Sequence, residues 1–132
     1  MKRSRIRPLT WVLASVVVVL IIVVLAGHFW LQVSAISTAR DWARLAPFPA
    51  TAHDQKIDAE GSPFTREFII SFTAPPDDVR KWISASPGPA SATRSADGGI
   101  TVYSITPGDG ADFAEVRVDE KTGRVIIHTY WS

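Results

Sequence analysis

Glu115 and His128 are the residues best placed to do chemistry, because they lie in two segments predicted to pair as a hairpin. The expected register puts Glu115 directly opposite His128, with Arg117 next on the same face. A carboxylate that orients an imidazole is half of a general-base arrangement, which would suit a small hydrolase. The alternative is a cross-strand charge pair on a solvated face, which contributes roughly 0.2–1 kcal/mol. No serine or threonine occurs in a nucleophile-elbow pattern, so the charge pair is the favoured interpretation.

Other chemistries find little support in the residue types present. The chain has no cysteine, which excludes disulfides, thiolate nucleophiles and cysteine-ligated metals. His53, Asp54, Asp58 and Glu60 follow no standard metal spacing, and a charged surface loop explains them better. No phosphate-binding glycine loop or zinc pattern is present. We therefore expect neither a metal nor a cofactor.

One apolar stretch, residues 9–31, dominates the sequence. It contains no Asp, Glu, Lys or Arg, and Trp11 and Trp30 bracket it. In a helix these two indoles would lie about 28 Å apart, close to the ~30 Å thickness of the hydrocarbon layer. Trp at both edges is the aromatic-belt pattern of membrane helices. The sequence thus predicts a transmembrane helix with Trp11 and Trp30 at its edges.

The charges around this stretch predict its orientation. Four basic residues precede it in a short tail, residues 1–8, which should stay in the cytoplasm. The remaining domain would then be periplasmic or extracellular, held by a single-pass signal anchor in the cell membrane. The alternative is a signal peptide cleaved near Ala35, because residues 33–35 have the small-x-small look of a cleavage site.

The net charge of the part beyond the anchor argues against nucleic-acid binding. Of 14 basic residues four precede the anchor, which leaves ten against 13 acidic residues, a net charge of −3. A mildly acidic domain lacks the basic footprint that nucleic acid requires.

Beyond the anchor, residues 32–63 are expected to form a juxtamembrane helix and a linker. Residues 36–45 fall near helical spacing, either as a stalk with Trp42 on the headgroups or on the domain, or as a helix that docks a partner. Pro47 and Pro49 should stop this helix. Residues 50–63 are polar and contain Gly61 and Pro63, so a loop is expected.

Residues 64–132 are expected to form one small α+β domain. Phe64, Phe68, Ile70 and Phe72 alternate in a first strand. Residues 74–86 predict a helix that packs Val79, Trp82 and Ile83 on the sheet. Further strands are predicted at 100–106, 111–119 and 124–131, with a weak one at 92–96. The expected fold has two layers in the order β-α-β-β-β, an antiparallel sheet of about four strands with one packed helix.

The segment VRVDEKTGRV, residues 116–125, resembles the terminal hairpin of PepSY-type envelope domains, and a predicted helix lies upstream as in that family. The resemblance covers roughly the last third of the chain and assigns no functional residue.

Three functions fit these patterns. The favoured one is a non-enzymatic interaction or accessory module of the cell envelope, in which an exposed edge strand, at Ile100 or at Phe64, accepts a partner's strand. The second is an exported hydrolase that uses Glu115 and His128 in a shared cleft. The third is a small-ligand sensor, which needs an apolar cavity between helix and sheet.

Overall fold

The structure is a computed structural model that describes residues 8–132. It contains two compact units, Met1–Val33 and Ser34–Ser132, which are described separately. The four basic residues that predict the orientation, Lys2, Arg3, Arg5 and Arg7, lie outside the described residues.

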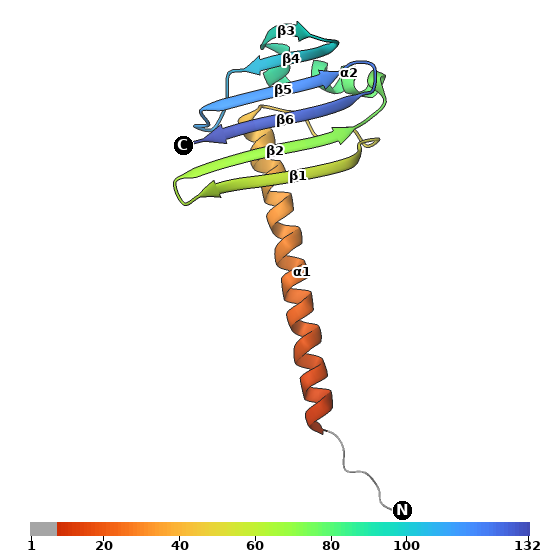
Figure 1. The fold of residues 1–132 in the computed structure, drawn as a ribbon, viewed down its shortest axis with the longest axis vertical. Helices are drawn as coiled ribbons and strands as arrows, with labels where there is room; N and C mark the ends of the chain where they lie inside the picture. Colours follow the sequence, from red (N-terminus) through yellow and green to blue (C-terminus); the bar gives the residue numbers. More distant parts are fainter. Residues whose placement is uncertain (1–7) are drawn as a thin grey trace, which may run out of the picture. The chain divides into compact units, whose positions relative to one another are not determined.

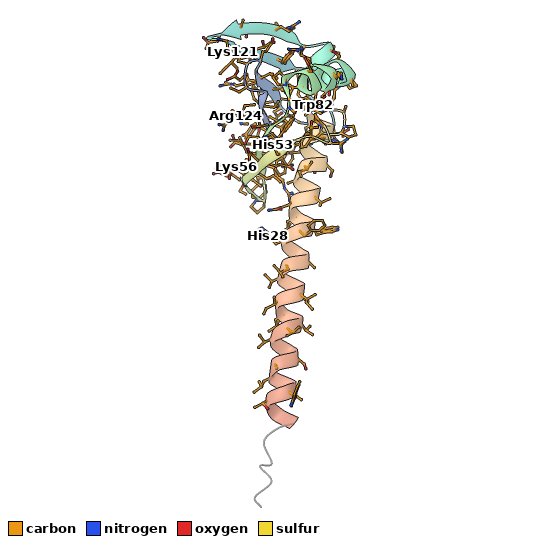
Figure 2. All side chains as sticks on the ribbon, turned by 90° about the vertical axis from the view of Figure 1, so that its right-hand side faces the viewer. His28, His53, Lys56, Trp82, Lys121 and Arg124 are labelled. Carbon is orange, nitrogen blue, oxygen red and sulfur yellow. The ribbon has the colours of Figure 1, made fainter. Side chains whose placement is uncertain are left out.

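The first unit contains the apolar part of helix α1, which spans Pro8–Trp42. Side chains of the apolar run point away from the helix axis (Figure 2). Both Trp11 and Trp30 are exposed. Thr10–Trp42 is long and apolar enough to cross a membrane. A signal sequence near the N-terminus can have the same length and composition. The predicted long apolar helix is therefore confirmed, and its length and composition fit an anchor and a signal sequence equally.

The last turns of α1 belong to the second unit and enter its core. Ala35, Ala39 and Trp42 recur at helical spacing, and all three are buried. The ring centroid of Trp42 lies 5.4 Å from that of Phe68. Of the two positions expected for Trp42, the structure shows the one on the domain. The helix ends before the predicted prolines, because Arg44 adopts a left-handed φ of 52° and the Leu45 amide donates to the Arg40 carbonyl.

The second unit is built on a six-stranded antiparallel sheet in the order β1-β2-β6-β5-β4-β3 (Figure 1). The strands are β1 His53–Ser62, β2 Thr65–Thr73, β3 Thr93–Asp97, β4 Ile100–Ile105, β5 Phe113–Asp119 and β6 Arg124–Trp131. Helices α2, Pro76–Ala85, and α3, Pro87–Ala90, lie between β2 and β3. The α+β class is confirmed, but the expected count of about four strands and the order β-α-β-β-β are wrong.

Strand β1 accounts for most of this error, because residues 50–63 were expected to be a loop. Nearly all of its side chains are exposed, so its sequence lacks the alternation that marks a half-buried strand. It forms by pairing along its length with β2, with Ile57 opposite Ile70 on the core side. Phe64, expected on the buried side of β2, lies in the turn between the two strands and is 79% exposed.

Strand β3 is the weak strand expected near residues 92–96, displaced by one residue. Its turn to β4 consists of Gly98 and Gly99, with φ values of 55° and 87°. Positive φ at both positions is the type I′ geometry of tight hairpins, which glycine adopts without a Cβ penalty.

Alternate residues of the inner strands face one side of the sheet and form the core with the helices. From the sheet these are Phe68, Ile70, Phe72, Tyr103, Ile105, Val116, Val118, Val125 and Ile127. Full burial of one such side chain contributes about 1.5–3 kcal/mol. Helix α2 adds Val79 and Trp82, as predicted, and the Trp82 ring lies edge-on to Phe72 with centroids 5.4 Å apart. The other face of the sheet, which carries Glu115 and His128, remains open.

Candidate functional site

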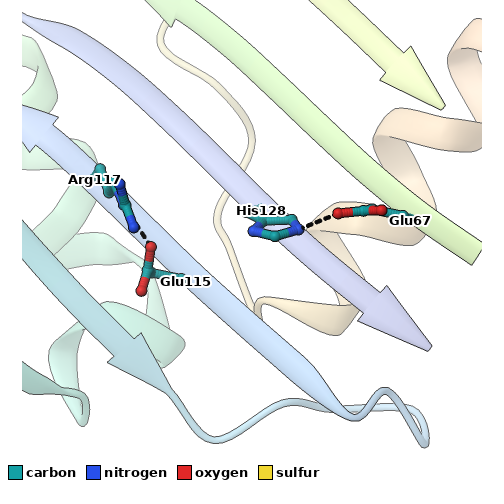
Figure 3. Close-up of polar contacts among 4 residues, drawn as sticks. All are labelled: Glu67, Glu115, Arg117 and His128. Carbon is teal, nitrogen blue, oxygen red and sulfur yellow. Dashed lines mark hydrogen bonds and ion pairs between the residues drawn. The ribbon is translucent and has the colours of Figure 1, made fainter. Parts of the chain in front are cut away.

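Glu115 and His128 lie opposite each other on the open face, in the predicted register. They are directly paired between β5 and β6. Their side chains nevertheless hydrogen-bond to different partners (Figure 3). The His128 Nε2 atom lies 2.6 Å from Oε1 of Glu67 on β2, and the Arg117 Nε donates to Glu115 Oε1 at 2.5 Å. The structure therefore shows two separate charge pairs.

The surroundings of His128 define what this arrangement can do. Its side chain is 36% exposed, and its ring lies edge-on to Phe113 with centroids 5.1 Å apart. A shallow hollow of about 170 Å³ is lined by Ile69, Glu115, Arg117, Ile126 and His128. Within the described residues, no hydroxyl group hydrogen-bonds to His128. The described residues therefore supply no nucleophile in contact with the pair.

Glu67 is the residue that sequence reasoning missed. It lies on β2, and its cross-strand neighbour on β6 is Tyr130, so its contact with His128 is diagonal. Diagonal neighbours on a sheet lie about 7–8 Å apart at the backbone, within reach of long side chains. Finding Glu67 required the pairing of β2 with β6, and fifty residues separate these strands in the sequence.

Potential metal ligands are not gathered in the part of the chain that the structure describes. No group of three or more His, Asp or Glu residues is placed to hold an ion there. His53 and Asp54, considered in the sequence as ligands, form an exposed pair at the start of β1, with Nε2 and Oδ2 3.7 Å apart.

A second concave feature lies between α2 and the sheet. It is a groove of about 240 Å³, lined by Val79 and Ile83 from α2 and by Tyr103, Val118 and Arg94 from the strands, among others. The Arg94 guanidinium carbon lies 5.4 Å from the centre of the Tyr103 ring, in a cation–π arrangement. Sequence reasoning placed no groove here, although the paired glycines 98 and 99 set the β3–β4 register that brings Arg94 opposite Tyr103.

The free edges of the sheet differ from those expected. Strands β1 and β3 are the outer strands. The strands at Ile100 and after Phe64, which were expected to offer edges, are β4 and β2 and are paired on both sides. The expected edges were wrong because the expected four-stranded sheet lacked β1 and β3, which are the outer strands.

Comparisons with protein-family models, curated proteins and solved structures found no match to this chain. The likeness of residues 116–125 to a PepSY-type hairpin stays a resemblance of one hairpin. Inference about function therefore depends on the geometry described above.

Proposed function

We propose that this protein is a membrane-anchored extracytoplasmic module that binds a protein partner of the cell envelope by adding a strand to its sheet. The observation that supports this most is the sheet's free edge at β3, whose five residues are all exposed. Unpaired N–H and C=O groups along an edge strand form a template for another chain. A catalytic role is less well supported, because Glu115 and His128 hydrogen-bond to different partners among the described residues.

The proposal takes α1 as a retained anchor with the N-terminus in the cytoplasm. The cleavage-like residues 33–35 lie inside a continuous helix, and Ala35 is buried in the domain core. Basic residues before an apolar span favour a cytoplasmic N-terminus.

Cysteine labelling tests the topology sharply, because the chain has no cysteine of its own. A membrane-impermeant maleimide should label Ser84→Cys, an exposed position on α2, in intact cells. Ser4→Cys should become reactive only after the membrane is permeabilised. The reverse pattern would contradict the orientation, and release of the labelled Ser84→Cys protein from the membrane fraction would contradict the anchor.

Photocrosslinking tests the binding role. A photoreactive residue placed at Ser95 on β3 should capture a specific neighbour in intact membranes, which mass spectrometry can identify. A matched probe at Lys81, an exposed position on α2 that does not line the groove beside β3, serves as the control for nonspecific capture. Capture at Ser95 that does not exceed capture at the control position would contradict the proposed docking role of β3.

A hydrolase is the second candidate, because Glu115 and His128 line the same hollow. It predicts that the purified chain cleaves an activated ester such as p-nitrophenyl acetate, and that His128→Gln abolishes the activity. Equal rates for the original chain and the variant would remove this candidate.

A further inference from the structure

We infer that the β3 edge and the groove beside it take an extended peptide that carries an acidic and an apolar side chain at alternate positions. This inference rests on the proposed function and deepens it by naming the edge and the chemistry of the partner segment.

The backbone of β3 offers hydrogen-bonding groups on its outer side. Asp97 and Ile100 flank the two-residue turn, so they form a hydrogen-bonded pair. Pairs alternate along an antiparallel ladder, so Arg94 and Ala96 direct their N–H and C=O groups away from β4. Within the described residues these groups have no backbone partner from another element. An added strand would pair with Arg94 and Ala96.

The groove lies on the side of the sheet to which such a strand would send its side chains. Arg94 is opposite Tyr103, which is buried on the helix side. Residues opposite Arg94 and Ala96 in an added strand would point to that same side. The groove volume of about 240 Å³ is below the ~300–1,000 Å³ typical of small-molecule sites. The apolar part of its lining, which includes Val79 and Ile83, suits one large aliphatic or aromatic side chain.

The charges that line the groove indicate that the peptide carries an acidic side chain. Among the described residues, Arg94 forms no ion pair, and it borders the groove. The other charged side chains of the lining are engaged within the chain: Arg80 with Asp77, Asp119 with the amides of Lys121 and Thr122, and Glu120 with the Thr101 hydroxyl. A carboxylate opposite Arg94 would neutralise the one cation of the lining that has no acidic partner.

The other free edge is less suited to strand addition. A bulge breaks the register of β1 between His53 and Lys56, and Asp54 there adopts a φ of 53°. Lys56, Asp58 and Glu60 place charges along the same strand. Bulges and charged side chains are devices that keep an edge from pairing. Strand β3 keeps a regular register over its whole length.

Peptide binding to the full chain in detergent micelles tests the inference. The probe is the fluorescein-labelled peptide TDTLTVT, whose acidic and apolar residues share one face when extended. Fluorescence anisotropy should show saturable binding. Two control peptides test the charge and its position: TKTLTVT reverses the charge, and TTDLTVT moves the acid to the other face. The dissociation constant of each should be at least roughly five-fold higher than that of TDTLTVT. Equal binding of all three peptides would overturn the inference.

Two variants separate the backbone from the charge. Ala96→Pro removes an outward N–H that β4 does not use, so it should abolish binding while the fold is kept. Arg94→Glu should reverse the preference, so that TKTLTVT binds better than TDTLTVT. Arg66→Glu, an exposed arginine on β2, is the matched control and should change neither affinity. Circular dichroism checks that each variant is folded, and a folded Ala96→Pro protein that still binds would contradict the edge assignment.

The outcome can be told apart from failure of the proposed function. A specific cross-linked partner in membranes, together with no preference among the three peptides, would refute this inference alone. Loss of both results would refute the docking role as well.

Discussion

The His128 Nε2 atom lies 2.6 Å from the Glu67 carboxylate on β2, although the residue directly opposite His128 on β5 is Glu115. Glu115 is instead the partner of Arg117 on its own strand. The open face therefore carries two independent charge pairs, and its chemistry differs from that suggested by the hairpin register.

A double-mutant cycle should detect this choice of partner. Glu67→Gln and His128→Gln should show a coupling of about 0.5–1 kcal/mol in the free energy of unfolding, because both side chains are about one-third exposed. Glu115→Gln combined with His128→Gln should show a coupling near zero. Urea denaturation in detergent measures both, and the opposite ranking would show that His128 prefers Glu115.

Replacement of Trp42 should destabilise the domain strongly. Its side chain is 8% exposed and packs on Phe68, so Trp42→Ala should cost about 3–5 kcal/mol. The control, Trp30→Ala, lies on the apolar part of α1 and is 74% exposed, so it should leave the domain's resistance to protease unchanged. Limited proteolysis in detergent compares them, and equal sensitivity would exclude α1 from the core.

Gly123 is required by a close approach of two backbones. It adopts a φ of 72°, and a Cβ there would lie 1.8 Å from the Ala74 carbonyl oxygen. Gly123→Ala should therefore cost about 2 kcal/mol or more, through the clash as well as the backbone strain. Gly110→Ala is the matched control, because Gly110 has a φ of 78° and open space around it. Its cost should stay near 1 kcal/mol by urea denaturation, and equal costs for the two variants would exclude the clash.

Asp119 should make the β5–β6 turn sensitive to acid. Hydrogen bonds from the amides of Thr122 and Lys121 to its carboxylate lower the pKa of Asp119 below its ordinary value. A depressed pKa means that this stabilisation is present above about pH 4 and is lost as pH falls through the folded-state pKa. The stability difference between the original chain and Asp119→Asn should be constant from about pH 7 to 5 and shrink below about pH 4. A difference that grows on acidification would contradict this sign.

Sequence patterns correctly predicted the elements whose structure depends mainly on residues close together in the chain. The apolar run implied a long helix, because a helix satisfies its own backbone hydrogen bonds when an apolar segment lies in lipid. The turn at residues 120–123 and the β5–β6 register followed from alternating side chains and a glycine with positive φ. Helix α2 was evident from Pro76 at its start and from the spacing of Val79 and Trp82.

Tertiary structure alone decided the features that depend on residues far apart in the chain. Strand β1 has almost no apolar face, so pairing with β2 rather than its own sequence makes it a strand. Glu67 reaches His128 because β2 lies beside β6, and Arg94 borders a groove because α2 packs across the sheet. The sequence by itself determined the anchor-like helix, the core hairpin and the α+β class, because short-range sterics and hydrophobic periodicity specify them. The sheet's edges, charge partners and groove came from long-range packing, whose register no local pattern encodes.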